Sequence, residues 1–345
     1  MKRVFAALAL ATVFAHPAHS QTLPTLATYA GEDREQRLIE GAKKEGLLVF
    51  YTTIPTEYAD RLIQPFAARY GVKVNVWRAR SEIVLQKVLT EARAGNANVD
   101  VISVFAPAAE AIRRENLMQE IRSRHHAELA RSAVPAHRQW VAQLQHVFVH
   151  AYNTDNVRKE DLPRTWHDLL APKWKGRLAI EGDDHEWLSS VIADIGEAEG
   201  VRFFRELVAK NGLSVRSGHP LLTNLVASGE VPLALTVYQY SVEQAKKKGS
   251  PIEWFVIEPA VSIPNAIGVA RRAPHPHAAL LFYDHLIGAE GQRILARIGY
   301  VPTHAKIESP VKGVKLKFLD AAILLDEQEK STRLFEQIVL KGAAR

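Results

Sequence analysis

The stretch Gly229–Gly249 reads GEVPLALTVYQYSVEQAKKKG and holds the pattern that decides the fold. Its first half, Val231–Val237, is an apolar, β-rich run without a charge, which is typical of a strand buried on both faces of a parallel sheet. Its second half, Ser241–Lys248, turns polar and ends in a lysine cluster before a glycine, as a short helix does. Tyr238 and Tyr240 therefore fall at a strand-to-helix junction, where open α/β sheets bind ligands. The alternative is that both tyrosines are ordinary half-buried aromatic residues.

Strands and helical stretches alternate along the rest of the chain. The first half predicts strands at 47–53, 72–77 and 99–105, separated by helices whose apolar residues keep the 3.6-residue period. The second half predicts strands at 146–152, 177–180, 213–216, 231–237 and 252–257, again with helical stretches between them. This β-α-β alternation indicates an α/β fold that contains two units with mostly parallel sheets.

The composition excludes several classes of protein. With 345 residues, 47% of them hydrophobic and 24% charged, the chain is long enough for two globular domains. It contains no cysteine, which excludes disulfides, thiolate metal sites, a cysteine nucleophile and a cysteine-linked lipid anchor. The formal net charge of +6 is spread along the chain without a basic stripe, so we expect no binding to nucleic acid.

The first twenty residues have the features of a secretory signal peptide. Lys2 and Arg3 precede an apolar run over residues 4–15, and the segment ends in the small-residue sequence Ala18–Ser20. The apolar run is shorter than the roughly 18 residues that a membrane-spanning helix needs, and no later segment approaches that length. We therefore expect a periplasmic protein that is cleaved near Ser20 and does not span the membrane.

Motifs of the common enzyme classes are absent from the sequence. The chain has no G-x-S-x-G, no Walker loop, no H-E-x-x-H and no dinucleotide-binding glycine pattern. We therefore expect a binding protein without enzymatic activity or cofactor, rather than a periplasmic enzyme.

Several strings resemble those of the extracellular solute-binding proteins of ABC importers, in the subgroup that includes the ferric-iron binders. They occur in order: LLVFYTT at 47–53, VDV at 99–101, AYNT at 151–154, TWHDLLAPKWKGRL at 165–178, SGEVP at 228–232 and APHPHAALLFYDHLIGAEG at 273–291. The resemblance implies a two-lobed periplasmic-binding-protein fold of type II, each lobe a mixed, mostly parallel sheet flanked by helices. It also implies a ligand cleft between the lobes, hinge closure, and delivery of the ligand to an inner-membrane ABC permease.

The same likeness implies how the chain divides. Residues 1–20 form the signal peptide, residues 21–145 with 260–300 form lobe one, and residues 146–259 with 301–345 form lobe two. We expect a monomer whose partners are a small solute and the permease.

Loops that follow the predicted strands supply the candidate ligand-binding residues, because ligands of α/β sheets bind at the carboxyl ends of strands. The loops Gly182–Glu186 and Ser217–His219 belong to this set. The candidate side chains offer hydroxyl, guanidinium and aromatic groups: Tyr51, Thr52, Thr53, Arg80, Ser81, Phe105, Ser217, Tyr238 and Tyr240.

Ferric iron (Fe3+), as a transported ligand, is the solute that the resemblance favours. The ferric binders carry two tyrosines at this junction, and the matching residues here are Tyr238 and Tyr240. A hard cation suits phenolate, carboxylate and imidazole ligands. We therefore expect Glu91 and either Asp184 or His185 to complete a metal site.

The chain departs from the family pattern at three places. Gln239 separates two tyrosines that are adjacent in the family, and Thr53 and Ile54 stand where many iron binders have a histidine. The loop Asp183–Glu186 is acidic, whereas anion-assisted iron binders offer small hydroxyl residues there. Three carboxylates would repel a bound anion.

The acidic loop has two further interpretations. Its acids can cap the helix that begins near Glu186, or they can bind an organic cation, such as a polyamine-like or thiamine-like solute, beside the aromatic tyrosines. A phosphonate-like oxyanion, held by Arg78, Arg80 and the helix starts at Ser81 and Ser217, is another alternative.

Overall fold

The computed structural model describes residues 22–343, so the predicted signal peptide and its cleavage site lie outside the described residues. Within them, one sheet has the strand order β2-β1-β3-β9-β4-β7-β5-β6. The bounds of these strands are β1 Leu47–Thr52, β2 Lys73–Arg78, β3 Val101–Phe105, β4 Val141–Asn153, β5 Leu178–Glu181, β6 Ser214–Arg216, β7 Leu233–Tyr238 and β9 Ala260–Val269. Three shorter strands pair at the side of this path: β8 (Ile252–Phe255) and β10 (Val301–Pro302) with β4, and β11 (Leu316–Phe318) with β9.

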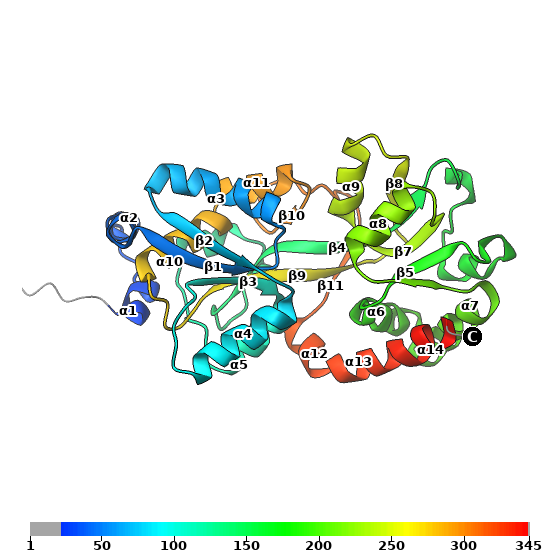
Figure 1. The fold of residues 1–345 in the computed structure, drawn as a ribbon, viewed down its shortest axis with the longest axis horizontal. Helices are drawn as coiled ribbons and strands as arrows, with labels where there is room; N and C mark the ends of the chain where they lie inside the picture. Colours follow the sequence, from blue (N-terminus) through cyan, green and yellow to red (C-terminus); the bar gives the residue numbers. More distant parts are fainter. Residues whose placement is uncertain (1–21, 344–345) are drawn as a thin grey trace, which may run out of the picture.

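Two parallel sets of strands lie at the two ends of the sheet. β1 pairs in parallel with β2 and β3, and β5 pairs in parallel with β6 and β7. The long strands β4 and β9 join the two sets, and they are antiparallel to each other and to β7 and β3, respectively. Figure 1 shows β4 and β9 running between the two halves of the molecule. This arrangement is the two-lobed α/β fold that the resemblance implied.

The predicted strands differ from the observed ones mainly where the chain crosses between the halves. β4 begins at Val141, five residues before its predicted start, and β9 was not predicted. Both strands are buried along their whole length, and β9 contains Pro264 and Asn265, which interrupt its apolar pattern. β7 begins at Leu233 rather than Val231, because the proline at position 232 has no N–H to donate to a neighbouring strand.

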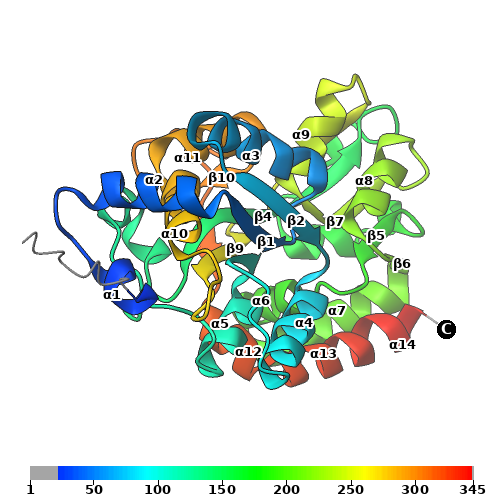
Figure 2. The same ribbon diagram turned by 60° about the vertical axis from the view of Figure 1, so that its left-hand side comes forward.

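Helices cover both faces of each half of the sheet (Figures 1 and 2). In the first half these are α2, α3, α10 and α11 on one side and α4 and α5 on the other; in the second half they are α8 and α9 opposite α6 and α7. The bounds are α1 Leu23–Thr28, α2 Arg34–Glu45, α3 Thr56–Tyr70, α4 Ser81–Arg93, α5 Ala106–Arg114, α6 His185–Ile195, α7 Glu197–Asn211, α8 His219–Ala227, α9 Gln239–Lys247, α10 Pro276–Ile287, α11 Ala289–Arg297, α12 Ala321–Asp326, α13 Gln328–Phe335 and α14 Lys341–Ala343.

The halves have separate hydrophobic cores. In the first half, α10 is buried from Ala278 to Ile287 and packs against β1, β3 and β9, with Phe282 contacting Phe50 edge to face. In the second half, one cluster around Phe204 and Trp187 and another around Val237 and Leu222 lie apart from this core. Rigid cores of this kind hold the strand ends, and the loops that follow them, in fixed positions.

The C-terminal helices span both halves of the molecule (Figure 1). α12 packs against α5, and Arg114 of α5 forms an ion pair of 2.5 Å with Asp326. α13 packs against α6, and the π-helical turn Glu336–Leu340 packs against α7. The predicted lobe boundaries therefore stay a prediction, because the described part of the C-terminal segment, residues 301–343, contacts both halves. No helix within residues 22–343 is long and apolar enough to cross a membrane.

Candidate functional site

The predicted strand-to-helix junction is confirmed. Tyr238 is the last residue of β7 and the N-cap of α9, with an extended backbone (φ −82°, ψ 134°). Gln239 is buried, while Tyr238 and Tyr240 are half-buried. The two tyrosine rings are stacked, with centroids 5.8 Å apart and an interplanar angle of 14°. The intervening glutamine therefore does not prevent the phenol rings from lying side by side.

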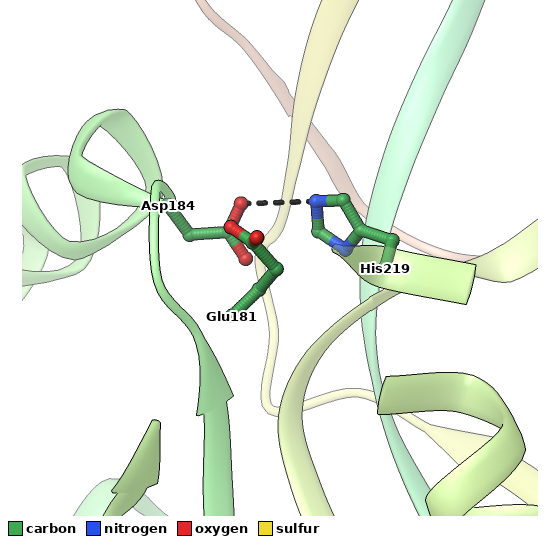
Figure 3. Close-up of side chains that lie close together, drawn as sticks. All are labelled: Glu181, Asp184 and His219. Atoms are coloured by element: carbon green, nitrogen blue, oxygen red, sulfur yellow. Dashed lines mark ion pairs between the residues drawn. The ribbon is translucent and has the colours of Figure 1, made fainter. Parts of the chain in front are cut away.

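A histidine lies against the first of these tyrosines. His219 is the first residue of α8, and its ring centroid is 3.9 Å from that of Tyr238. Its Nε2 lies 3.1 Å from Oδ1 of Asp184, an ion pair drawn in Figure 3. The sequence placed His219 in a candidate loop but assigned it no role.

Glu181 completes a cluster of ligating groups with Asp184 and His219. One ligand atom of each residue lies within 4.8 Å of the others (Figure 3). Glu181 ends β5, and its carboxylate accepts N–H groups from Asp183 at 2.6 Å and Gly218 at 2.7 Å. Because β5 and β6 are parallel neighbours, the loops after them meet at one edge of the sheet. A carboxylate pair with an imidazole can hold a metal ion.

Burial and neighbouring charges set the protonation of this site. Burial, and to a lesser extent Asp184, raises the pKa of Tyr238 well above the value of a free phenol. Burial and Asp184 also raise the pKa of the Glu181 carboxyl. Burial lowers the pKa of His219, but the nearby carboxylates, Asp184 first, outweigh it and leave that pKa raised. The neutral phenol of Tyr238 therefore lies beside the imidazole of His219, whose charged form the nearby carboxylates stabilise.

Aromatic rings surround a second histidine next to the tyrosines. His146 lies in β4, and its ring centroid is 4.7 Å from Phe105, 4.9 Å from Tyr238, 5.8 Å from Tyr240 and 5.7 Å from Tyr300. Burial lowers its pKa to about 3, so the ring is neutral at physiological pH. Among the predicted residues, Phe105 is thus brought to the tyrosine pair, whereas His146 and Tyr300 were not anticipated.

Buried polar atoms without partners gather in this region. Buried polar atoms in proteins are normally hydrogen-bonded, and a ligand can supply missing partners. Among the described residues, the side-chain atoms that have no partner include Asp184 Oδ2, His185 Nε2, His219 Nδ1, Gln239 Nε2, His146 Nδ1 and Tyr300 Oη. Their concentration around the tyrosine pair marks this region as the candidate ligand site.

Side chains from the two halves of the sheet meet beside the tyrosines. The hydroxyl of Tyr58, in α3, donates a hydrogen bond to the side-chain oxygen of Gln244, in α9. A second contact joins the loop before α4 to the loop before α6: Nη1 of Arg80 lies 3.8 Å from Oδ2 of Asp183, and both side chains are exposed. The candidate site is therefore bounded by both halves.

Glu91 is paired with residues other than the tyrosine pair. Its carboxylate accepts a hydrogen bond of 3.0 Å from the hydroxyl of Tyr51 and lies 2.7 Å from Nζ of Lys87. Glu91 belongs to α4, where Lys87 precedes it by one helical turn. The structure thus brings two predicted residues, Glu91 and Tyr51, into contact, and the Glu91 carboxylate is hydrogen-bonded to the Tyr51 hydroxyl.

The acidic loop differs from its interpretation as a side-chain cap. Asp184 is the N-cap of α6, which begins at His185, but its side chain makes no capping hydrogen bond. Instead, Oδ1 of Asp184 lies 3.1 Å from Nε2 of His219. Nδ1 of His185 lies 2.6 Å from the backbone oxygen of Asp183, so that nitrogen is engaged locally.

The predicted hydroxyl residues hold loops in place. Thr52 accepts an N–H from Ile54 at 3.0 Å, and Ser81 accepts one from Phe105 at 3.1 Å. Thr53 accepts a hydrogen bond of 3.0 Å from the side chain of Asn265. Ser217 is exposed. Ligand binding by these four residues stays a prediction.

The fold and the site between its halves define a solute-binding protein. The chain belongs to the bacterial extracellular solute-binding proteins, whose family model matches residues 96–327. It is 24% identical over 307 residues to the major ferric iron-binding protein of Neisseria gonorrhoeae, covering 83% of this chain and 90% of the relative.

Solved structures share the fold. Iron-bound HitA from Pseudomonas aeruginosa superposes with a TM-score of 0.74 at 19% identity, covering 85% of this chain and 99% of that one. AfuA from Actinobacillus pleuropneumoniae, with fructose-6-phosphate bound, gives a TM-score of 0.72 at 21% identity, covering 86% and 99%. The same fold therefore accommodates ligands of different chemistry.

Proposed function

We propose that this protein captures ferric iron in the periplasm and delivers it to an ABC permease of the inner membrane. The observation that carries the proposal is the stacked pair Tyr238 and Tyr240 beside the cluster of Glu181, Asp184 and His219. Phenolate and carboxylate oxygens with an imidazole are suitable donors for a trivalent hard cation. The relative from Neisseria gonorrhoeae, named as a ferric iron-binding protein, supports the same ligand.

The proposed donors are Tyr238, Tyr240, Asp184 and His219. Because burial keeps the phenol of Tyr238 protonated, a bound trivalent cation must displace its proton. Oδ2 of Asp184 and Nδ1 of His219 are buried without partners, so both can take up a new one. Glu91 and His185 remain the alternatives predicted from the sequence, and Glu91 would first have to leave Tyr51 and Lys87.

A small organic solute is the second candidate. The half-buried rings of Tyr238 and Tyr240, with Phe105 beside Tyr238, offer flat apolar faces with polar edges, which suits an organic ligand. Arg80 and Asp183 at the side could pair with a charged substituent of either sign.

A titration decides between the two candidates. Metal-free protein is titrated with iron(III) supplied as a weak chelate, and the visible spectrum and the affinity are measured. Bound iron should give the colour of tyrosinate-to-iron charge transfer. A protein that stays colourless and shows no affinity for iron(III) would exclude iron as the ligand and favour the organic solute.

The role that we propose is binding without catalysis. A transport component returns its ligand unchanged, so prolonged incubation followed by recovery of the solute tests this role. Export and cleavage near Ser20 belong to the same proposal, and mass spectrometry of the periplasmic fraction should find a chain that begins near Gln21. Conversion of the solute, or a mature chain that begins at Met1, would contradict these parts of the proposal.

A further inference from the structure

A large cavity lies in the first half of the molecule, away from the tyrosine pair. Its volume is about 620 Å³, and it is bounded by the start of α2, the end of α3, the turn Arg124–Glu128, and the junction of α10 and α11. Figures 1 and 2 show α2, α10 and α11 on the side of the molecule opposite to α8. None of the proposed iron donors lines it. Its volume is in the range of small-molecule sites, which is about 300–1,000 Å³.

The charged side chains around this cavity leave an excess of arginine. Five arginines and four carboxylates line it. Arg34 pairs with Asp284, Arg69 lies 3.4 Å from Glu290, and Arg124 lies 2.6 Å from Glu35. The other two arginines, Arg122 and Arg293, form no ion pair with any residue between 22 and 343.

Arg34 lines the cavity and carries two buried donors that lack partners among residues 22–343. The residue is only 8% exposed, and its Nη1 binds Asp284. Its Nε and Nη2 are buried and have no hydrogen-bond partner among the described residues. Leaving such donors unpaired is unfavourable, and a guanidinium presents Nε and Nη2 as a fork that fits the two oxygens of a carboxylate or phosphate.

Two helix starts add positive potential to the same cavity. Arg34 and Glu35 are the first residues of α2, and Gly288, Ala289 and Glu290 form the start of α11. Both helices have more than two turns, so their N-termini favour an anion.

We propose that this cavity is a second ligand site, which binds a small oxyanion, a carboxylate or a phosphate, through the fork of Arg34. Arg122 and Arg293 supply the balancing charge at its exposed side. The site is independent of the tyrosine pair and goes beyond the proposed capture of iron. It gives the protein a means to bind a small anion while the cleft carries its own solute.

Calorimetric titration of the metal-free full chain tests the proposal, with inorganic phosphate and citrate as separate probes. Saturable binding of one molecule per chain by either probe is the expected result, and the two arms distinguish phosphate from carboxylate chemistry. Arg34→Lys, which retains the charge but removes the fork, should weaken binding about tenfold or more. The double variant Arg122→Gln with Arg293→Gln should weaken it by a similar factor and involves only exposed side chains.

Two controls separate this site from the cleft and from overall charge. Arg164→Gln removes an exposed arginine in the other half of the molecule, and it should leave anion binding unchanged. Tyr238→Phe should also leave it unchanged, even if it abolishes binding of iron. The proposal is overturned if neither probe saturates, if the double arginine variant binds as the unmodified protein does, or if Tyr238→Phe abolishes anion binding. If Arg34→Lys proves unstable in a thermal melt, the double variant alone decides.

Discussion

The imidazole of His219 lies over the phenol of Tyr238, with ring centroids 3.9 Å apart and an interplanar angle of 36°. This contact links the junction after β7 to the loop after β6, and through the ion pair of His219 with Asp184 it reaches the loop after β5. Three loops from neighbouring strands thereby converge on one phenol. The position of Tyr238 is therefore set by tertiary contacts as well as by the strand that ends with it.

Removal of either phenol hydroxyl should weaken iron binding. We expect Tyr238→Phe and Tyr240→Phe each to lower the affinity for iron(III) by about tenfold or more and to weaken the charge-transfer band, because each removes one donor. Tyr152→Phe, which changes another tyrosine of the second half, is the matched control. If both variants at the junction retain the colour and affinity of the unmodified protein, the tyrosine pair is not the metal site.

Iron affinity should rise with pH. Since burial keeps the Tyr238 phenol protonated well above pH 10, each phenolate formed on binding releases a proton. One released proton increases the affinity by about tenfold per pH unit. Titrations at several pH values between 6 and 8, with the same chelate and corrected for its own protonation, measure this slope. An affinity independent of pH would mean that no phenol loses its proton.

Replacement of Asp184 should destabilise the metal-free protein most at low pH. The pKa of His219 is raised in the folded state, so its charge stabilises the fold below the unfolded value near 6.5, and this contribution is lost as the pH rises through the folded pKa. Breaking a buried pair on one side costs about 3 kcal/mol. We therefore expect Asp184→Asn to lower the free energy of unfolding by roughly this amount at pH 6 and by less at pH 9.

Urea unfolding at the two pH values measures this effect. Asp183→Asn is the matched control, because its side chain is exposed and lies in the same loop. If Asp184→Asn lowers the free energy of unfolding by the same amount at both pH values, His219 and Asp184 do not form a charged pair.

His150 should make the protein less stable in acid. It is 3% exposed, Nδ1 lies 2.7 Å from the backbone oxygen of Leu235, and burial lowers its pKa to about 4. Between pH 6.5 and about 4 the unfolded chain binds a proton that the folded one does not, so stability falls as the pH falls through this range. The shift corresponds to about 3 kcal/mol.

His150→Gln removes the ionisable group and should flatten this part of the stability profile. Urea unfolding from pH 7 to pH 4 is the measurement, and His167→Gln, at an exposed histidine, should leave the profile unchanged. A profile for His150→Gln as steep as that of the unmodified protein would contradict the assignment.

The hydrogen bond between Tyr58 and Gln244 joins the two halves of the molecule and should stabilise their contact. Tyr58→Phe removes the donor, and a typical hydrogen bond contributes about 1 kcal/mol, or roughly fivefold in ligand affinity. Small-angle scattering should give a smaller radius of gyration with ligand than without it, and a smaller difference for the variant. Tyr29→Phe, whose hydroxyl binds Asp33 within the N-terminal segment, is the control. No change on saturation with the true ligand would exclude hinge closure.

Local sequence patterns determined the α/β alternation and the junction at Tyr238. Apolar runs that end in polar loops encode strands directly, because a strand and its burial depend on adjacent residues. The strings along the chain also identified the family. Strand β9 was not predicted, because it carries Pro264 and Asn265 within a buried strand and its sequence does not read as a continuous apolar run.

Tertiary structure alone decided which polar groups meet at the site. Glu181, Asp184 and His219 come from two loops that are brought together by the parallel pairing of β5 and β6, and no spacing in the sequence encodes that pairing. The same holds for Glu91, whose carboxylate was expected at the metal but pairs with Tyr51 and Lys87. Periodicity records the environment of a segment, whereas contacts between distant segments depend on how strands are ordered in the sheet.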